Sequence, residues 1–244
     1  MIDIHTHILP GIDDGARSMD DTVEMAWIAV ENGTTDLIAT PHCNIPGHYE
    51  NFFDSAYRRL FEAIRQVLER ERVPLRLYPG MEVYATEELP RLFEEGLLLT
   101  LNGGHYLLME FDFCAEPEFA DRILAQMQKL GVIPVIAHIE RYRFVQARPE
   151  LAARWRNRGC VIQCNKGSFQ GRFGSEEQRL AYWLMDQRLV DVIASDAHRP
   201  YMRTPSLGAV RDQLSMDYPE TYLRRLFREN ARCILRDQPI PRDR

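Results

Sequence analysis

Metal-binding residue types recur at one kind of place in this sequence, at the ends of short apolar runs. A carboxylate or imidazole buried there is costly unless a cation compensates it. Histidine nitrogens and carboxylate oxygens, without cysteine, form a ligand set that suits Mn²⁺, Zn²⁺ or Fe²⁺. The pattern predicts a multi-metal hydrolytic centre, and the residues that end these runs are His5, His7, His42, Glu82, Glu110, His138, Asp196 and His198.

The spacing of these residues supports a shared site. His5 and His7 are two residues apart, and Asp196 and His198 share the same spacing. Because side chains at positions i and i+2 of a strand point to the same side, each pair presents both donor groups together. Glu110 follows three apolar residues and precedes Phe111, so its carboxylate needs a cation. A set this large exceeds what one ion uses, and we expect two or three ions bridged by carboxylates.

Strand and helix patterns alternate along the chain, which is typical of parallel strands joined by helices. Barrels of parallel strands collect their active sites at the C-terminal ends of the strands. We therefore predict an α/β fold of barrel type that forms one domain over residues 1–244, with the tail 237–244 frayed. The predicted strands lie near residues 1–7, 37–42, 75–83, 106–111, 132–138, 160–164 and 190–195.

Capping and periodicity locate the helices between these strands. Ser18 with Asp21 forms a capping-box start for a helix that ends near Gly33. Residues 51–72 carry an aromatic and aliphatic stripe at three- and four-residue spacing, which predicts a helix packed on the barrel. Further helices are expected near 86–95, 117–130, 147–158, 175–188, 205–215 and 219–235.

Composition excludes several classes of protein. The 36 acidic residues outnumber the 30 basic ones, giving a net charge of −6, whereas a nucleic-acid surface requires a basic face. The chain begins directly with a strand pattern, and no apolar stretch approaches the length of a membrane span. We expect a cytoplasmic protein that neither inserts into membranes nor binds nucleic acid.

The five cysteines do not form a catalytic or metal-binding motif. No two of them make a C-x-x-C pair, and Cys160 and Cys164 fall on one face of a strand, where buried thiols are common. A cysteine-dependent tyrosine phosphatase needs C-x5-R for its phosphate loop. This route is excluded because the residues six positions after the cysteines are Tyr49, Ala120, Lys166, Gln170 and Pro239.

Several short motifs together resemble the PHP (polymerase and histidinol phosphatase) superfamily. They are His5-Thr6-His7, Asp14-Gly15, Pro41-His42, Gly80-Met81-Glu82, the strand ending in His138, and Asp196-Ala197-His198. More narrowly, the run from Asp3 to Gly15, Ala39-Thr40-Pro41-His42 and His138-Ile139-Glu140-Arg141-Tyr142 resemble the PHP-type protein-tyrosine phosphatases of bacterial capsule and exopolysaccharide loci, the CpsB/CapC type. The similarity spans residues 1 to about 235.

This resemblance implies a distorted, TIM-like (β/α)₇ barrel with a trinuclear centre, usually described with manganese. It assigns the first ion to His5, His7, Glu82 and Asp196, the second to Glu82, Glu110 and His138, and the third to His42, His198 and an aspartate of the first loop. Asp14 is favoured over Asp13 because it precedes Gly15. The resemblance also implies that Arg141 and Arg203 bind phosphate, with Arg199 in reserve.

The leading hypothesis is a metal-dependent protein-tyrosine phosphatase. In it, a metal-activated water attacks the phosphoryl group of a phosphotyrosine protein, expected to be a bacterial tyrosine kinase that controls polysaccharide export. The alternatives are a small-molecule phosphatase, such as one for histidinol phosphate, and a non-catalytic PHP regulatory module. His48 and His105 receive no role, and Lys166 is left to contact either the phosphate or a carboxylate.

Overall fold

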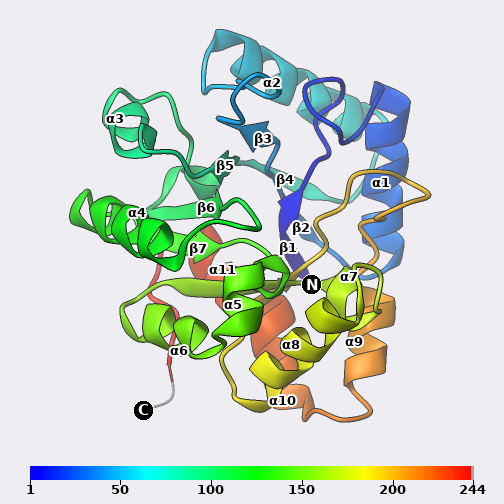
Figure 1. Ribbon diagram of the computed structural model, residues 1–244. Coiled ribbons are helices and arrows are strands. Elements are labelled where there is room, and N and C mark those ends of the chain that lie inside the picture. The colour runs from blue at the N-terminus through cyan, green and yellow to red at the C-terminus, as the bar shows by residue number, and fades with distance from the viewer. Residues whose placement is uncertain (243–244) are drawn as a thin grey trace.

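A curled sheet of parallel strands forms the centre of the molecule, and helices cover its outer side (Figure 1). The structure, a computed structural model, describes residues 1–242. All pairings between the named strands are parallel, as the alternating sequence pattern predicts. The strands are β1 (Ile2–Thr6), β2 (Asp36–Ala39), β3 (His42–Cys43), β4 (Arg76–Pro79), β5 (Glu82–Tyr84), β6 (Tyr106–Glu110), β7 (Ile133–Ile136), β8 (Val161–Asn165) and β9 (Val192–Ala194).

Two strands that the sequence predicts as continuous are interrupted. The segment 37–42 breaks between β2 and β3, where Pro41 has no N–H to donate to a ladder. The segment 75–83 breaks between β4 and β5 at Gly80 and Met81. The hydrogen-bonded sheets are therefore β1-β2-β4 and β3-β5-β6-β7-β8-β9. Both breaks fall at the same level, so that His42 and Glu82 are partners in the register of β3 and β5.

The first and last strands also meet. A bridge joins Thr6 to Ala197, the residue after Asp196. The amide of His7 donates to the carbonyl of Ala197 at 2.8 Å, and the amide of Asp196 donates to the carbonyl of His5 at 2.9 Å. The curl of the sheet thus brings segments 190 residues apart in sequence side by side.

Helices join the strands, and most of them pack on the outer side of the sheet. They are α1 (Met19–Glu31), α2 (Ser55–Arg70), α3 (Leu89–Glu94), η1 (Leu101–Gly103), α4 (Pro117–Lys129), η2 (Ile139–Arg141), α5 (Arg143–Ala147), α6 (Glu150–Asn157), α7 (Lys166–Phe169), α8 (Ser175–Asp186), α9 (Gly208–Leu214), α10 (Glu220–Arg224), the π-helical η3 (Arg225–Glu229) and α11 (Asn230–Leu235). No helix within residues 1–242 combines the length and the apolar character that crossing a membrane requires.

Helix starts follow local capping. The Ser18 hydroxyl accepts a hydrogen bond from the amide of Asp21 at 3.2 Å, as predicted. The Asp21 carboxylate accepts a hydrogen bond from the amide of Arg17 and not from that of Ser18, as a capping box would require. The second helix begins at Ser55 and not at 51, because the Asp54 carboxylate caps it by accepting the amides of Ala56 and Tyr57.

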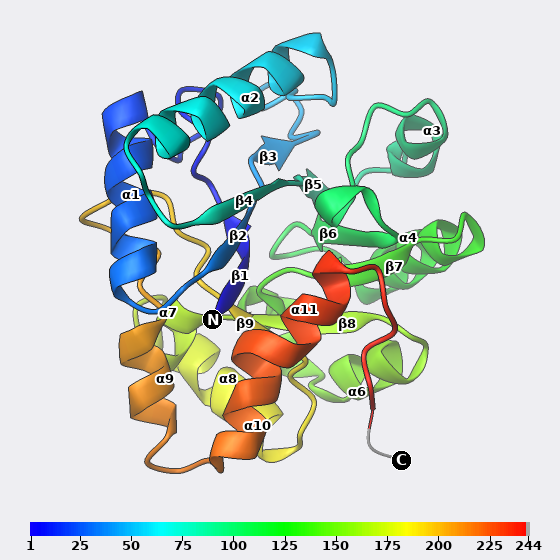
Figure 2. The ribbon, with the colours of Figure 1, turned by 180° about the vertical axis from the view of Figure 1, so that it is seen from behind.

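The apolar core has two parts. The larger part lies between the sheet and the surrounding helices. The smaller part fills the inside of the curl, where Ile4, Leu108 and Val135 meet Ala231 and Ile234 of α11. Figure 2 shows α11 lying across the back of the sheet, near the starts of the strands. The helix closes this end of the curl and leaves the opposite end for chemistry.

The tail differs from expectation. Its residues 237–242 pack along the strand starts and are not frayed, because their polar groups find partners there. The Asp237 carboxylate accepts the amide of His105 at 2.7 Å, and the Tyr106 hydroxyl donates to the carbonyl of Gln238 at 2.7 Å. Arg242 donates to the carbonyl of Cys160 at 2.5 Å. Residues 243–244, also part of that prediction, lie outside the described residues.

The break between β4 and β5 generates a stability prediction. The buried hydroxyl of Tyr57 donates to the carbonyl of Gly80 at 2.8 Å and lies 3.2 Å from its amide. Tyr57→Phe should lower the free energy of unfolding by about 1–3 kcal/mol, since both backbone groups would be left buried and unpaired. Denaturant titration at a fixed metal concentration measures the change. The control Tyr84→Phe loses only an exposed bond to Asp112 and should shift stability by less than about 0.5 kcal/mol; equal losses in both variants would contradict the interpretation.

Candidate metal centre

The predicted ligands come together at the C-terminal ends of the strands. His5 lies on β1 and His7 just beyond it, Glu110 ends β6, His138 follows β7, and the remaining ligands stand at the strand breaks, in the first loop or after β9. Most of these side chains are buried, whereas the Asp14 side chain is 47% exposed and therefore marks the open side.

The first group joins β1 to β5 and β9. Nε2 of His5 lies 3.2 Å from Oε1 of Glu82 and 3.5 Å from Oδ1 of Asp196. Nε2 of His7 lies 3.3 Å from the other Glu82 oxygen and 3.4 Å from the same Asp196 oxygen. These four side chains surround one small volume, as the resemblance implies for the first ion.

The second group shares Glu82 with the first. Nε2 of His138 lies 3.0 Å from Oε1 of Glu82 and 3.4 Å from Oε1 of Glu110. Nδ1 of His42 lies 3.0 Å from Oε2 of Glu82 and 3.6 Å from Oε2 of Glu110. His42 therefore stands between two groups, whereas the resemblance implies a place for it only with the third ion.

The third group faces the opening and separates the two candidate aspartates. Oδ1 of Asp14 lies 3.3 Å from Nε2 of His198 and 3.6 Å from Nε2 of His42. Asp13 instead turns away from these nitrogens: its carboxylate accepts from Nδ1 of His7 at 2.8 Å and from the amide of His42 at 3.0 Å. The geometry thus places Asp14 beside the imidazoles of His42 and His198, and Asp13 behind the imidazole of His7.

Gly15 fixes the loop that carries both aspartates. A Cβ at this position would lie 2.1 Å from the carbonyl oxygen of His7. The amide of Ala16 donates to that same carbonyl at 3.0 Å. Only glycine permits this close approach, which holds Asp13 against His7 and Asp14 over the centre.

Mutual electrostatics keep the carboxylates ionised. Burial raises the pKa of Glu82, but the charges of His5 and His42 outweigh it and hold the pKa well below its usual value. The pKa of Asp196 is lowered in the same way by His5 and Arg203, against the effect of burial. Burial lowers the pKa of His138, whereas hydrogen bonds to Glu110 and Glu82 raise it to about 9. The protonated imidazoles compensate the buried carboxylates here, and a divalent cation that displaced these protons would supply the same compensation.

Several donor atoms suit metal ions better than protein partners. Nδ1 of His42, Oε2 of Glu82 and Nε2 of His198 are buried and make no hydrogen bond within the described residues, although each lies close to an oppositely charged group. Within residues 1–242, three groups of such atoms are each close enough to share an ion: His7, Asp14, His42 and His198; His5, His7 and Asp196; and His42, Glu82 and Glu110. Nitrogen and oxygen donors without sulfur fit Mn²⁺, Zn²⁺ or Fe²⁺.

Two residues that sequence reasoning missed orient the ligands from β8. The Gln163 amide oxygen lies 3.1 Å from Nδ1 of His5 and accepts the amide of His138 at 2.9 Å. The Gln163 amide nitrogen donates to Asn165 at 2.9 Å, and Asn165 donates to Oδ2 of Asp196 at 2.5 Å. The available signal was two amides in a strand that is otherwise apolar, since buried polar groups require partners.

The arginines divide into two sets. Nη2 of Arg203 lies 2.6 Å, and Nη1 of Arg141 lies 3.8 Å, from Oδ2 of Asp196. Both side chains are partly exposed, so their remaining donors can face a ligand. Arg199 turns toward α1 instead, where Nη1 lies 3.9 Å from the carboxylate of Asp21. The structure brings Arg141 and Arg203 together at the centre and leaves Arg199 apart.

Three residues of the site have left-handed backbone conformations. The φ angles are 31° at His138, 48° at Asp196 and 51° at Arg203. Residues with a Cβ rarely adopt such angles, and they concentrate at functional sites where the surrounding structure enforces them.

The other polar candidates lie elsewhere. His48 is exposed, and His105 pairs with Asp237 at the opposite end of the strands. Lys166 pairs with no carboxylate within residues 1–242: Nζ donates to the carbonyl of Ser206 at 2.8 Å and lies 3.4 Å from the hydroxyl of Thr204. Lys166 therefore supports the loop that carries Arg203.

Comparison with known proteins identifies tyrosine-protein phosphatases as relatives of this chain. The tyrosine-protein phosphatase YwqE of Bacillus subtilis (strain 168) is 36% identical over 244 residues, which cover 98% of this chain and 93% of YwqE. The tyrosine-protein phosphatase CpsB of Streptococcus pneumoniae is 28% identical over 98% of this chain and 100% of CpsB. Both relatives span nearly the whole of the present chain.

Solved structures give the same result. A chain from the crystal structures of YwqE and of CpsB from S. pneumoniae, described as unique metal-dependent tyrosine phosphatases, superposes with a TM-score of 0.89 at 35% identity, covering 100% of both chains. The phosphotriesterase homology protein from Escherichia coli, complexed with phosphate, shares the fold at a TM-score of 0.62 and 10% identity, covering 93% of this chain and 95% of its own.

A family model described as capsular polysaccharide synthesis, CpsB/CapC, matches residues 1–236. The resemblance inferred from the short motifs is thereby confirmed, and the chain belongs to the CpsB/CapC family.

Proposed function

We propose that the protein is a metal-dependent protein-tyrosine phosphatase. The observation that carries this proposal is the convergence of the ligand groups on Glu82 and Asp196, with two arginines on the same Asp196 carboxylate. Relatives of nearly equal length are named tyrosine-protein phosphatases, which favours this activity over a small-molecule phosphatase. No residue of the proposed ligand set is missing from the sequence, which argues against a non-catalytic regulatory module.

We assign the metal-binding role to the residues that form the three groups. Mn²⁺ is the proposed metal, with two or three ions, and Zn²⁺ or Fe²⁺ would suit the same donors. Bound ions would supply an activated water and neutralise charge on the phosphoryl oxygens. Glu82 is the proposed bridge because it touches both of the first two groups. The proposed ligands are His5, His7, Asp14, His42, Glu82, Glu110, His138, Asp196 and His198.

Arg141 and Arg203 are the proposed phosphate-binding residues. Their guanidinium groups lie at the edge of the metal cluster, where planar donors can hold two phosphoryl oxygens at once. Asp196 orients both groups and lowers the cost of placing two cations close together. Arg199 is a weaker candidate, because it faces Asp21.

The proposed substrate is a phosphotyrosine protein, with a bacterial tyrosine kinase as the expected partner and no role for nucleic acid. The family's connection with capsular polysaccharide synthesis supports this choice. We also propose a cytoplasmic location, in which the five cysteines, all free, would stay reduced. For the fold, we propose one domain and a closed (β/α)₇ barrel, supported by the hydrogen bonds between β1 and the segment after β9.

Activity should require metal and not thiol. Exhaustive chelation should abolish turnover of a phosphotyrosine peptide, and added Mn²⁺ should restore it. Alkylation should leave most turnover intact, because no cysteine lies among the ligands and burial raises the pKa of Cys43 and of Cys160 to about 12. Steady-state assays before and after each treatment decide the matter. Full activity in verified metal-free protein would refute the proposal.

Glu82→Gln should reduce metal content as well as rate. The amide keeps the shape of the side chain but lacks the charge that a bridging ligand supplies. Elemental analysis of the purified protein should show fewer ions per chain than in the parent. His48→Ala, which alters an exposed histidine outside the cluster, is the control and should keep the parental content. A full complement of ions in the Glu82 variant would contradict the bridging role.

Arg141→Ala and Arg203→Ala should lower kcat/KM without removing metal. The expected loss is about 2–4 kcal/mol of transition-state stabilisation for each, typical of deleting one donor to developing charge. Lysine at either position should restore only part of the rate, because it keeps the charge but not the two-pronged geometry. The assay pairs kinetics on a phosphotyrosine peptide with metal analysis. Near-parental kcat/KM in both alanine variants would show that the metals alone recognise phosphate.

A further inference from the structure

Arg141 lies between two phenylalanine rings. Its guanidinium carbon is 4.4 Å from the ring centre of Phe113 and 4.6 Å from that of Phe173. Phe113 stands three residues after Glu110, and Phe173 lies in the loop between α7 and α8. Two separate segments thus place an aromatic ring on either side of the proposed phosphate-binding group.

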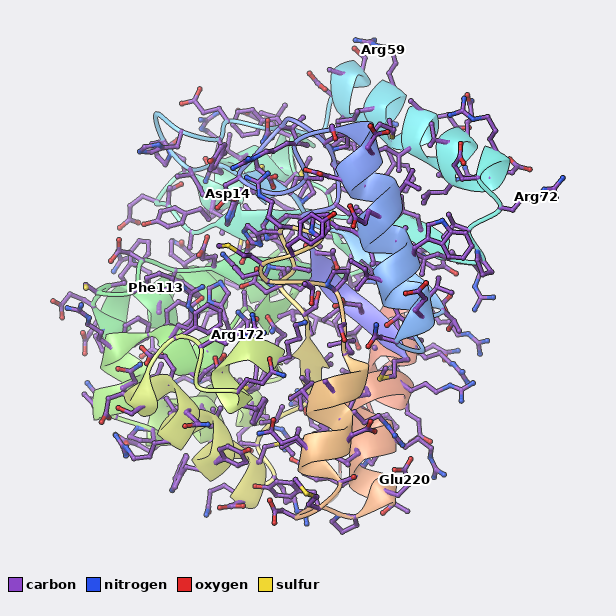
Figure 3. All side chains as sticks on the ribbon, turned by 90° about the vertical axis from the view of Figure 1, so that its right-hand side faces the viewer. Asp14, Arg59, Arg72, Phe113, Arg172 and Glu220 are labelled. Carbon is purple, nitrogen blue, oxygen red and sulfur yellow. The ribbon has the colours of Figure 1, made fainter. Side chains whose placement is uncertain are left out.

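The two rings stand at the border between the metal centre and solvent. Phe113 meets the His138 ring edge-on, with ring centres 5.8 Å apart, yet both phenylalanines remain partly exposed. In Figure 3, Phe113 and the neighbouring Arg172 lie on the same side of the molecule as Asp14, which marks the open side of the centre. When a ligand covers large apolar groups that are exposed to water, the burial of their surface favours binding.

A pocket opens beside these two rings and Arg141. Its volume is about 330 Å³, and its lining includes Asp112, Phe113, Arg141, Arg143, Phe173 and Glu177. A cavity of about 150 Å³ already accepts benzene. The pocket therefore has room for one aromatic ring, and its walls combine the two phenylalanine rings with charged side chains.

The position of Phe173 is fixed by the helix beneath it. A Cβ on Gly167 of α7 would lie 2.8 Å from a ring carbon of Phe173. The ring thus rests directly on the backbone of α7, and its place is set before any ligand arrives. A preformed wall spares the entropy of ordering the ring on binding.

We propose that this pocket, called here the aryl pocket, binds the phenyl ring of the substrate's phosphotyrosine, which makes Phe113 and Phe173 specificity-determining residues. The inference rests on the proposed function. A phosphoryl group held by the metals and Arg141 must direct its ester oxygen away from the buried ligands. The aryl pocket receives the ring on the far side of that oxygen, whereas an alkyl phosphate leaves the pocket unfilled.

Contacts between aromatic rings should make the preference for aryl over alkyl ligands large enough to measure. Arg141 occupies one face of each phenylalanine, which leaves the exposed parts of the two rings for the substrate. Edge-to-face and offset-stacked pairs of rings stabilise a complex beyond the area they bury. The enzyme should accordingly prefer aryl over alkyl dianions that share the same phosphate-like head group.

Calorimetric titration of the Mn²⁺-loaded protein with phenylphosphonate and methylphosphonate tests the proposal. When the pH is held above the second pKa of both ligands, both present the same dianion, so the ratio of their Kd values isolates the ring. The parent should bind phenylphosphonate more tightly, and Phe113→Leu and Phe173→Leu should each shrink this preference about 3- to 10-fold. Tyr201→Leu, which changes an 80% exposed aromatic on the loop after β9, is the matched control and should leave the ratio unchanged.

Two results would overturn the aryl pocket: no preference for phenylphosphonate in the parent, or leucine variants that weaken both phosphonates by the same factor. The second result would mean that the rings only position Arg141. Gly167→Ala keeps both rings but displaces Phe173, so it should also shrink the preference for phenylphosphonate. This variant replaces the test if either leucine variant fails to fold. A protein that discriminates between the phosphonates yet hydrolyses no phosphotyrosine peptide would refute the proposed function and not the pocket.

Discussion

The arrangement of the strands depends on one buried, ionised carboxylate, that of Glu82. Glu82 is only 1% exposed, and its two oxygens contact four imidazoles. A charge at this depth costs several kcal/mol unless opposite charge and hydrogen bonds compensate it. No single segment can supply four imidazoles to one point, so separate strands must end at the same level. The curl of the sheet and the paired breaks in its strands satisfy that requirement.

Orientation of the ligands comes from residues that are not ligands. An imidazole that faces the cluster through Nε2 needs an acceptor for the proton on Nδ1. Gln163 is that acceptor for His5 and Asp13 is that acceptor for His7, from different parts of the chain. Strand β8 contributes no ligand, yet through Gln163 and Asn165 it connects two histidines to Asp196. The centre is therefore held by a second layer that spans the sheet.

Residue type and position at strand ends were enough to predict which side chains the fold brings together, because few other reasons put carboxylates and imidazoles after buried strands. They were not enough to separate Asp13 from Asp14, which differ only in how the loop packs through Gly15. Gln163 and Asn165 were missed because an amide's role depends on neighbours distant in sequence. The breaks in the strands and the packing of the tail likewise depend on tertiary partners. The alternation of strands and helices, in contrast, can be predicted from local sequence patterns.

The left-handed backbone at His138, Asp196 and Arg203 has a consequence for the life of the protein in the cell. Each such residue costs of order 1–3 kcal/mol, which a marginally stable fold must offset elsewhere. Any ion that binds these segments only when they are folded opposes their local opening. The same loops would then resist proteases when the ion is plentiful and yield to them when it is scarce. Turnover of the enzyme would follow the cell's supply of metal, with no dedicated regulator.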